Sequence, residues 1–161
     1  MRVEALGPLV VTDRGEDVVI GGARLRVLLI RLALEPGRTV TVDSLAAALW
    51  PDGGPGDRVH ALQALVHRLR RRLPAGRLRS VPGGYALDVD SVDVQEFERL
   101  VAEGGGALRA GDAPLAAARL REALGLWRGD ALADAAGAPF ADAAAVRLEE
   151  LRLSATEDRA S

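Results

Sequence analysis

The sequence contains no cysteine and no lysine, and aromatic residues make up only 3% of it. The lack of cysteine excludes a disulfide framework and a thiolate metal site. Because aromatic side chains are so few, the core has to be built from Leu, Val and Ala. No apolar run reaches the roughly 18 residues of a membrane-spanning helix, so none is expected. The first residues, Met1 to Pro8, also lack the apolar stretch of a signal peptide, which predicts a cytoplasmic location.

Charge is distributed unevenly along the chain, although the formal net charge is only -2. Residues 1–90 contain 13 Arg and 10 acidic residues, whereas residues 91–161 contain 8 Arg and 13 acidic residues. Seven arginines lie between Arg58 and Arg79, and no Asp or Glu lies among them. A basic half followed by an acidic half suggests two different tasks.

Short apolar runs interrupted by turn residues predict strands in two places. Residues 2–20 are expected to form a small antiparallel sheet, with Val18–Ile20 as its third strand. Residues 78–81 and 85–89 are two extended segments joined by Pro82-Gly83-Gly84, a connection typical of a hairpin tip.

Helical spacing of apolar residues predicts helices between these two groups of strands. The first covers residues 25–35 and ends at a Pro-Gly pair. The second is expected to be capped by Asp43 or Ser44 and to end at Trp50. The third follows Asp57, which we expect to cap it, and runs to residue 73.

This third helix has one apolar face and one polar face. The apolar face is predicted to carry Val59, Leu62, Leu65, Val66, Leu69 and Leu73. The polar face carries His60, Ala64, His67, Arg68 and Arg71, with Gln63 at its edge and Arg70 and Arg72 on the flanks. A helix with this division fits the DNA major groove, where Arg recognises guanine and Gln recognises adenine. The alternative is an ordinary solvated helix face, but such faces normally mix charges of both signs.

From Asp93 onward the pattern is helical only, and we place a domain boundary near Ser91. A helix is expected around Phe97–Leu108, although Gly104-Gly105-Gly106 disfavours it by about 1 kcal/mol per glycine. Two further helices are expected, the last beginning at Ala138-Pro139. The spacing of small and large apolar residues between Gly111 and Leu124 is similar to a tetratricopeptide unit. Its apolar face either binds a partner or packs within the molecule.

Several segments, in this order, resemble one known family. They are Leu6–Leu9, Asp43–Leu45, Leu49–Trp50, Ala61–Gln63, His67–Leu73, Pro82–Tyr85, Asp93–Leu100, Leu124–Gly129, Ala131–Leu132, Ala138–Phe140 and Arg147–Arg152. The segments from Asp43 to Tyr85 look like the OmpR-type winged helix. The complete set is similar to the Streptomyces antibiotic regulatory protein family, which joins such a domain to a helical bacterial transcriptional activation domain. The family's activation domain is longer than residues 91–161, so the chain is interpreted as a fragment or a short form.

The resemblance implies that residues 57–73 are the recognition helix and that Pro82–Tyr85 is the wing. Arg68 lies where the family places a DNA contact. Trp50 either packs under the recognition helix, which we favour, or touches the DNA backbone. His67 stands where relatives often have Ser, and His60 where a small polar residue is usual, which leaves the base preference open.

The fold class predicted is α+β: a winged helix-turn-helix with an N-terminal antiparallel sheet at 1–90, then an all-α, tetratricopeptide-like domain at 91–161. The expected DNA-binding residues are His60, Gln63, His67 and Arg68 in the major groove, Arg70, Arg71, Arg72, Arg77 and Arg79 on phosphates, and Gly83 and Gly84 at the wing tip. No catalytic motif and no cofactor are expected. No metal site is expected either, because the histidines His60 and His67 lack a third ligand.

The function predicted is a sequence-specific transcriptional activator rather than an enzyme. The resemblance implies double-stranded DNA with promoter direct repeats as the target, two protomers side by side, and recruitment of RNA polymerase through its sigma or alpha subunit. By analogy, the regulated genes would belong to secondary metabolism, including antibiotic biosynthesis. The alternative is a helical protein–protein interaction module without specific DNA binding.

Overall fold

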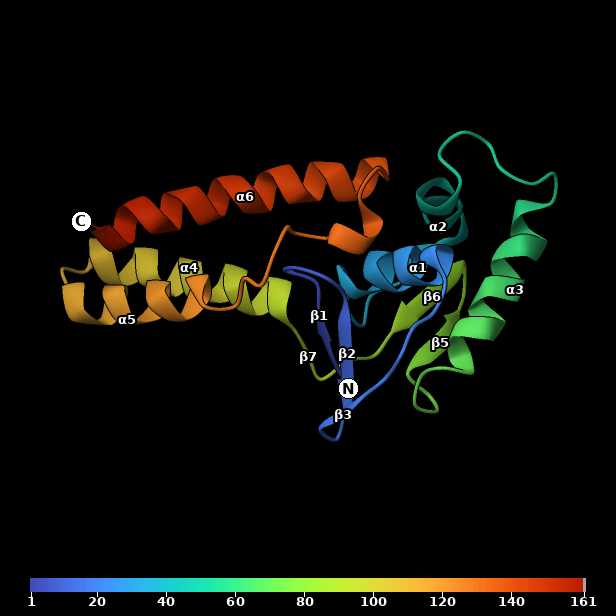
Figure 1. The fold of residues 1–161 in the computed structure, drawn as a ribbon, viewed down its shortest axis with the longest axis horizontal. Coiled ribbons are helices and arrows are strands. Elements are labelled where there is room, and N and C mark those ends of the chain that lie inside the picture. The colour runs from blue at the N-terminus through green and yellow to red at the C-terminus, as the bar shows by residue number, and fades with distance from the viewer. Residues whose placement is uncertain (161) are drawn as a thin grey trace.

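The computed structural model describes residues 1–160 as a mixed α/β fold with two small sheets and a lobe of long helices (Figure 1). The strands are β1 (Arg2–Glu4), β2 (Val10–Asp13), β3 (Glu16–Asp17), β4 (Val40–Thr41), β5 (Leu78–Val81), β6 (Gly84–Leu87) and β7 (Ser91–Val92). The helices are α1 (Ala23–Ala33), α2 (Val42–Leu49), α3 (Arg58–Arg70), α4 (Asp93–Arg109), α5 (Ala113–Leu124), the short 3-10 helix η1 (Ala133–Ala135) and α6 (Pro139–Ala160). None of these helices is long and apolar enough to cross a membrane.

The first sheet has the strand order β3-β2-β1-β7, and the second has the order β4-β6-β5. The expected third strand at Val18–Ile20 is wrong, because β3 is Glu16–Asp17. The chain reverses at Arg14 and Gly15, whose φ angles are 53° and 80°, so Glu16 already pairs with Asp13. Val19 beyond this pairing is 77% exposed.

Helix α2 begins earlier than expected. Its N-cap is Thr41, whose hydroxyl accepts a hydrogen bond from the Ser44 amide at 3.1 Å, so the cap predicted at Asp43 or Ser44 is wrong. The physical reason is that β4 ends at Thr41, which has extended backbone angles, and the helix follows directly. Trp50, which follows the last residue of α2, is buried in the hydrophobic core, and its packing under the recognition helix stays a prediction.

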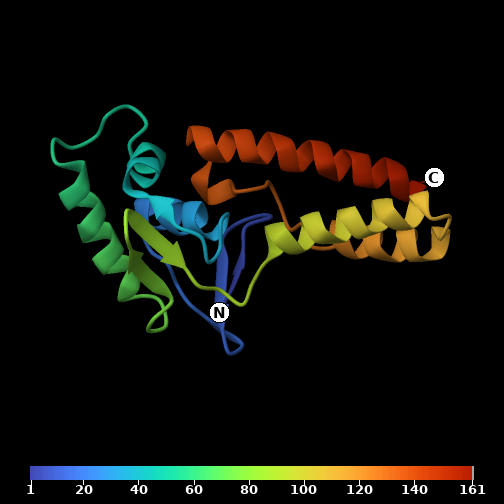
Figure 2. The same ribbon diagram turned by 180° about the vertical axis from the view of Figure 1, so that it is seen from behind.

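Helix α3 begins after Asp57, whose carboxylate accepts a hydrogen bond from the His60 amide, as expected of a cap. Four members of the predicted apolar face are buried within α3, and they are Leu62, Leu65, Val66 and Leu69. Val59 was assigned to the same face but is 52% exposed, because it lies in the first turn of α3 and borders an open hollow beside α2. The β5–β6 hairpin lies beside the second half of α3 (Figures 1 and 2).

The lobe of α4, α5 and α6 lies on the other side of α1 from α3 (Figures 1 and 2). Helix α4 continues through Gly104–Gly106, and its close packing on α5 explains the first of these glycines. A Cβ atom at Gly104 would lie 2.6 Å from a terminal carbon of Leu120 and 2.7 Å from its Cγ. The cost of glycine in a helix is therefore accepted here to bring two helices close together.

The two halves of the chain are joined by contacts that cross the boundary predicted near Ser91. Strand β7 pairs in parallel with β1, with Val92 opposite Val3. The buried carboxylate of Asp93 accepts hydrogen bonds from the amides of Ala5 at 2.7 Å and Leu6 at 2.9 Å. Burial raises the pKa of this carboxyl group, although the two amides oppose the shift. The division into domains 1–90 and 91–161 stays a prediction.

Candidate nucleic-acid interface

The side of α3 opposite its buried face is open to solvent. His60, Gln63 and His67 follow one another at helical spacing along this side, and all three are exposed. Ala64 lies among them without blocking access. The structure therefore places a stripe of hydrogen-bonding groups along one side of a helix. A helix that recognises base edges in the DNA major groove requires this arrangement.

Arg70 lies on the hairpin side of α3, and protein groups already bind it. Its Nε donates a hydrogen bond to the Leu78 carbonyl at 3.0 Å, and an Nη donates to the Ser80 hydroxyl at 2.7 Å. Its guanidinium carbon also lies 5.8 Å from the centre of the Tyr85 ring. Arg70 thus connects α3 to both strands of the hairpin.

The two arginines of the hairpin are paired with acids that the sequence places after it. Arg79 contacts Asp88 through two nitrogen atoms, one of them at 3.1 Å. Arg77 lies 3.3 Å from an oxygen of Asp90. The hydrogen bond from Arg79 lowers the pKa of the Asp88 carboxyl group. The pKa of Asp90 is also lowered, first by its hydrogen bond with the N-terminal ammonium group and then by Arg77.

The hairpin tip depends on glycine at two positions. Gly83 has a φ angle of +86°, a conformation that favours glycine, and the space around it is open. A Cβ atom at Gly84 would lie only 2.0 Å from the Val40 carbonyl oxygen, because β4 pairs with β6 at this position. The two glycines therefore shape the tip and its approach to β4.

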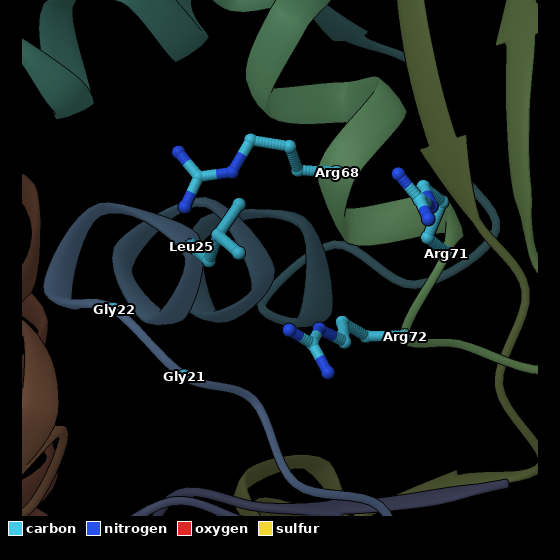
Figure 3. A pocket seen from close by; sticks show the side chains of 6 residues that line it. All are labelled: Gly21, Gly22, Leu25, Arg68, Arg71 and Arg72. Carbon is cyan, nitrogen blue, oxygen red and sulfur yellow. The ribbon is translucent and has the colours of Figure 1, made fainter.

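The α1 side of α3 borders a hollow of about 440 Å³ that sequence reasoning did not find (Figure 3). It is lined by Gly21, Gly22, Leu25, Arg68, Arg71 and Arg72. Figure 3 shows Arg68 and Arg72 reaching from the end of α3 toward the α1 side. No hydrogen bond or ion pair from these three arginines to another side chain is found within residues 1–160.

The second half of the chain matches a known protein family. Residues 92–161 match the family described as bacterial transcriptional activator domain. The match covers the helical lobe of α4, α5 and α6, together with η1. In the described part of the chain, no group of three or more His, Cys, Asp or Glu side chains could hold a metal ion.

Curated relatives match nearly the whole chain, activator domain included. Regulatory protein DnrI of Streptomyces peucetius is 38% identical over 99% of this chain and 63% of its own length. Transcriptional regulator RedD of Streptomyces coelicolor is 37% identical over 98% of this chain and 48% of its own length. The chain thus spans less than two thirds of either relative. These matches support the resemblance to the Streptomyces antibiotic regulatory protein family.

A solved structure supports the fold. Mycobacterium tuberculosis EmbR, determined in complex with a low affinity phosphopeptide, aligns with a TM-score of 0.90 at 30% identity. The alignment covers 99% of this chain and 44% of that chain, so the activator domain and the basic half are arranged alike in both.

Proposed function

We propose that this chain is a DNA-binding transcriptional activator of the Streptomyces antibiotic regulatory protein type. Helices α1 to α3 and the β5–β6 hairpin would form its OmpR-type winged helix-turn-helix, with α3 as the recognition helix. The observation that carries the proposal is the stripe of His60, Gln63 and His67 on the open side of α3, flanked by arginines that pair with no acid within residues 1–160. The names of DnrI and RedD as regulators support it.

In this proposal the three polar side chains contact base edges, since Gln63 can pair with adenine and the histidines offer ring N–H donors. Arg71 and Arg72 neutralise phosphates beside the groove. Arg77 and Arg79 lie at the hairpin, where Gly83 and Gly84 would lead the wing into the adjacent minor groove. Because both arginines already have aspartate partners, their phosphate contacts require an exchange of partners on binding.

Arg70 takes a different role from the one expected of it. Its hydrogen bonds to Leu78 and Ser80 make it a brace that holds the hairpin against α3. Its contribution to DNA binding would therefore be indirect, through the fixed angle between recognition helix and wing.

The target and partners follow from the family resemblance. We propose tandem direct repeats near a promoter, bound by two protomers side by side. The helical lobe would contact RNA polymerase through its sigma or alpha subunit. The regulated genes would serve antibiotic or other secondary-metabolite biosynthesis.

Fluorescence anisotropy with promoter DNA from the gene neighbourhood, against scrambled DNA at two salt concentrations, tests the proposal. We expect a specific complex that persists at the higher salt while scrambled DNA is released. Gln63→Ala should weaken the specific complex by about 1–3 kcal/mol and relax the preference at one base pair. Absence of binding to either DNA at low salt would reject the proposal and favour a protein–protein interaction module.

A further inference from the structure

The start of α1 and the end of α3 together border two adjoining hollows. The larger, of about 440 Å³, is lined by the three arginines of the α3 end together with Gly21, Gly22 and Leu25. The smaller, of about 240 Å³, shares Gly22, Leu25 and Arg68 with the first, and Ala23, Arg24 and Leu65 complete it. Neither hollow is lined by an acidic residue.

Four arginines from two separate elements therefore line the two adjoining hollows, and Arg68 lines both of them. Arg24 comes from the first turn of α1, and the others are Arg68, Arg71 and Arg72. Each of the four is exposed, and none forms a hydrogen bond or ion pair with another side chain of residues 1–160. Positive charges repel one another, so an anion that enters this cluster lowers its electrostatic free energy.

The backbone at the start of α1 adds donors to this cluster. The amides of Ala23, Arg24 and Leu25 have no partner within the helix. No side chain caps this end, and no acidic residue lies in the first turn. Unpaired amides and the helix dipole favour an anion at this position. The arginines carry the assignment, and the helix end strengthens it.

We infer that Arg24, Arg68 and Arg72, with Arg71 beside them, bind a phosphate group against the start of α1. Arg is suited to this role because its guanidinium group donates two parallel hydrogen bonds to phosphate oxygens. The inference rests on the proposed function insofar as the DNA backbone is the expected source of that phosphate. Arg68 then contacts the backbone rather than a base edge, and α1 becomes part of the DNA-binding surface.

The salt dependence of DNA binding tests this assignment in the full chain. We expect Arg68→Gln and Arg72→Gln each to lower the slope of log K against log salt by about one. Both should weaken specific and scrambled DNA by the same factor. The matched control is Arg121→Gln, which removes the same charge from an exposed position on α5 and should leave the slope unchanged.

Ala23→Asp separates binding from folding. A carboxylate in the first turn of α1 stabilises the helix dipole, so the melting temperature should not fall. The same carboxylate would repel a phosphate, so the variant should lose DNA affinity to the same extent as Arg72→Gln. Equal slopes for the parent and all three site variants would overturn the inference while leaving the proposed function in place. A changed preference at a single base pair in Arg68→Gln would overturn it for Arg68.

A titration with sodium phosphate, against sodium chloride at equal ionic strength, separates a free phosphate from the DNA backbone. Saturable shifts of the arginine Nε–H resonances in the parent, absent in Arg72→Gln, would support a phosphate site even if the parent bound no DNA. That result together with unchanged DNA slopes would assign the site to a free phosphate compound and overturn the DNA source. No shifts in the parent, together with unchanged DNA slopes, would overturn the phosphate site itself.

Discussion

The arginines on the two sides of α3 differ in what already binds them. On the hairpin side, Arg70, Arg77 and Arg79 are held by Leu78, Ser80, Asp90 and Asp88. On the α1 side, Arg24, Arg68 and Arg72 border two adjoining hollows, and no acidic residue lines either of them. In the sequence, all of these arginines except Arg24 belong to one basic stretch. The difference teaches that the positive charge available to a ligand depends on which arginines lie beside acidic side chains in the folded protein. Only the second group is free to bind an external anion.

The largest expected effect compares the two sides directly by DNA binding. Arg68→Gln combined with Arg72→Gln should lower the salt slope by about two, because both side chains are free to neutralise phosphates. Arg77→Gln combined with Arg79→Gln removes the same charge but should change the slope by less than about one, since each arginine has to leave an aspartate first. Anisotropy titrations over a range of salt concentrations measure both. Equal losses for the two pairs would abolish the distinction between the sides.

The second effect concerns stability and comes from the brace. Arg70→Ala removes two hydrogen bonds from a charged donor to the hairpin, and we expect the free energy of unfolding to fall by about 1–2 kcal/mol. Arg68→Ala, its neighbour on the other side, should change it by less than about 0.5 kcal/mol. Urea unfolding followed by circular dichroism gives both values. A larger loss for Arg68→Ala than for Arg70→Ala would contradict the comparison.

A third variant converts a held arginine into a free one. Asp88→Asn removes the charge that pairs with Arg79 and leaves the guanidinium group available to DNA. We expect tighter binding to specific and scrambled DNA alike, with the salt slope raised by up to about one. Glu149→Gln, an exposed acid on α6, serves as the control for the same change in net charge. Equal gains in the two variants would mean that only net charge matters.

The smallest effect is the pH dependence of the same pair. Because Arg79 lowers the pKa of Asp88 below its ordinary value of 3.8, the ionised pair stabilises the folded state above that pH and loses this contribution as the pH falls below it. Asp88→Asn should therefore flatten the acid limb of stability slightly. Asp93 acts in the opposite direction, since a raised pKa lets stability decline as the pH rises above 3.8. The midpoints of urea unfolding, measured between about pH 3 and pH 6 in buffers of constant ionic strength, would show the sign of each effect.

Local features of the fold could be predicted from the sequence because neighbouring residues determine them. The cap at Asp57 follows from the preference of Asp for helix N-caps, and the buried face from Leu62 to Leu69 follows from helical spacing. The third strand was misplaced because the Arg14–Gly15 turn decides which residues pair, whatever the β propensity of Val18–Ile20. Gly104 was interpreted as a weak point because its neighbour, Leu120, lies on another helix.

The candidate site divides in the same way. The exposed stripe on α3 follows from periodicity, and the structure places His60, Gln63 and His67 as that periodicity predicts. The partners of the hairpin arginines could have been found by counting pairs back from the tip, because Arg79 is opposite Ala86, two residues before Asp88. The contribution of α1 could not, since nothing local connects Gly22 with an arginine on α3.

The parallel pairing of β7 with β1 has a consequence for how this protein is made. Ala5 leaves the ribosome early, but the carboxylate that binds its amide is 88 residues further along the chain. Strand β1 can pair with β2 soon after both are synthesised, but its pairing with β7 must wait for residues 91–92, and pairing at such sequence separation is slow to form. If activator domains were exchanged between regulators by cutting at residue 90, β1 would be separated from its own parallel partner, β7. A junction placed after Asp93 keeps the strand and its carboxylate together.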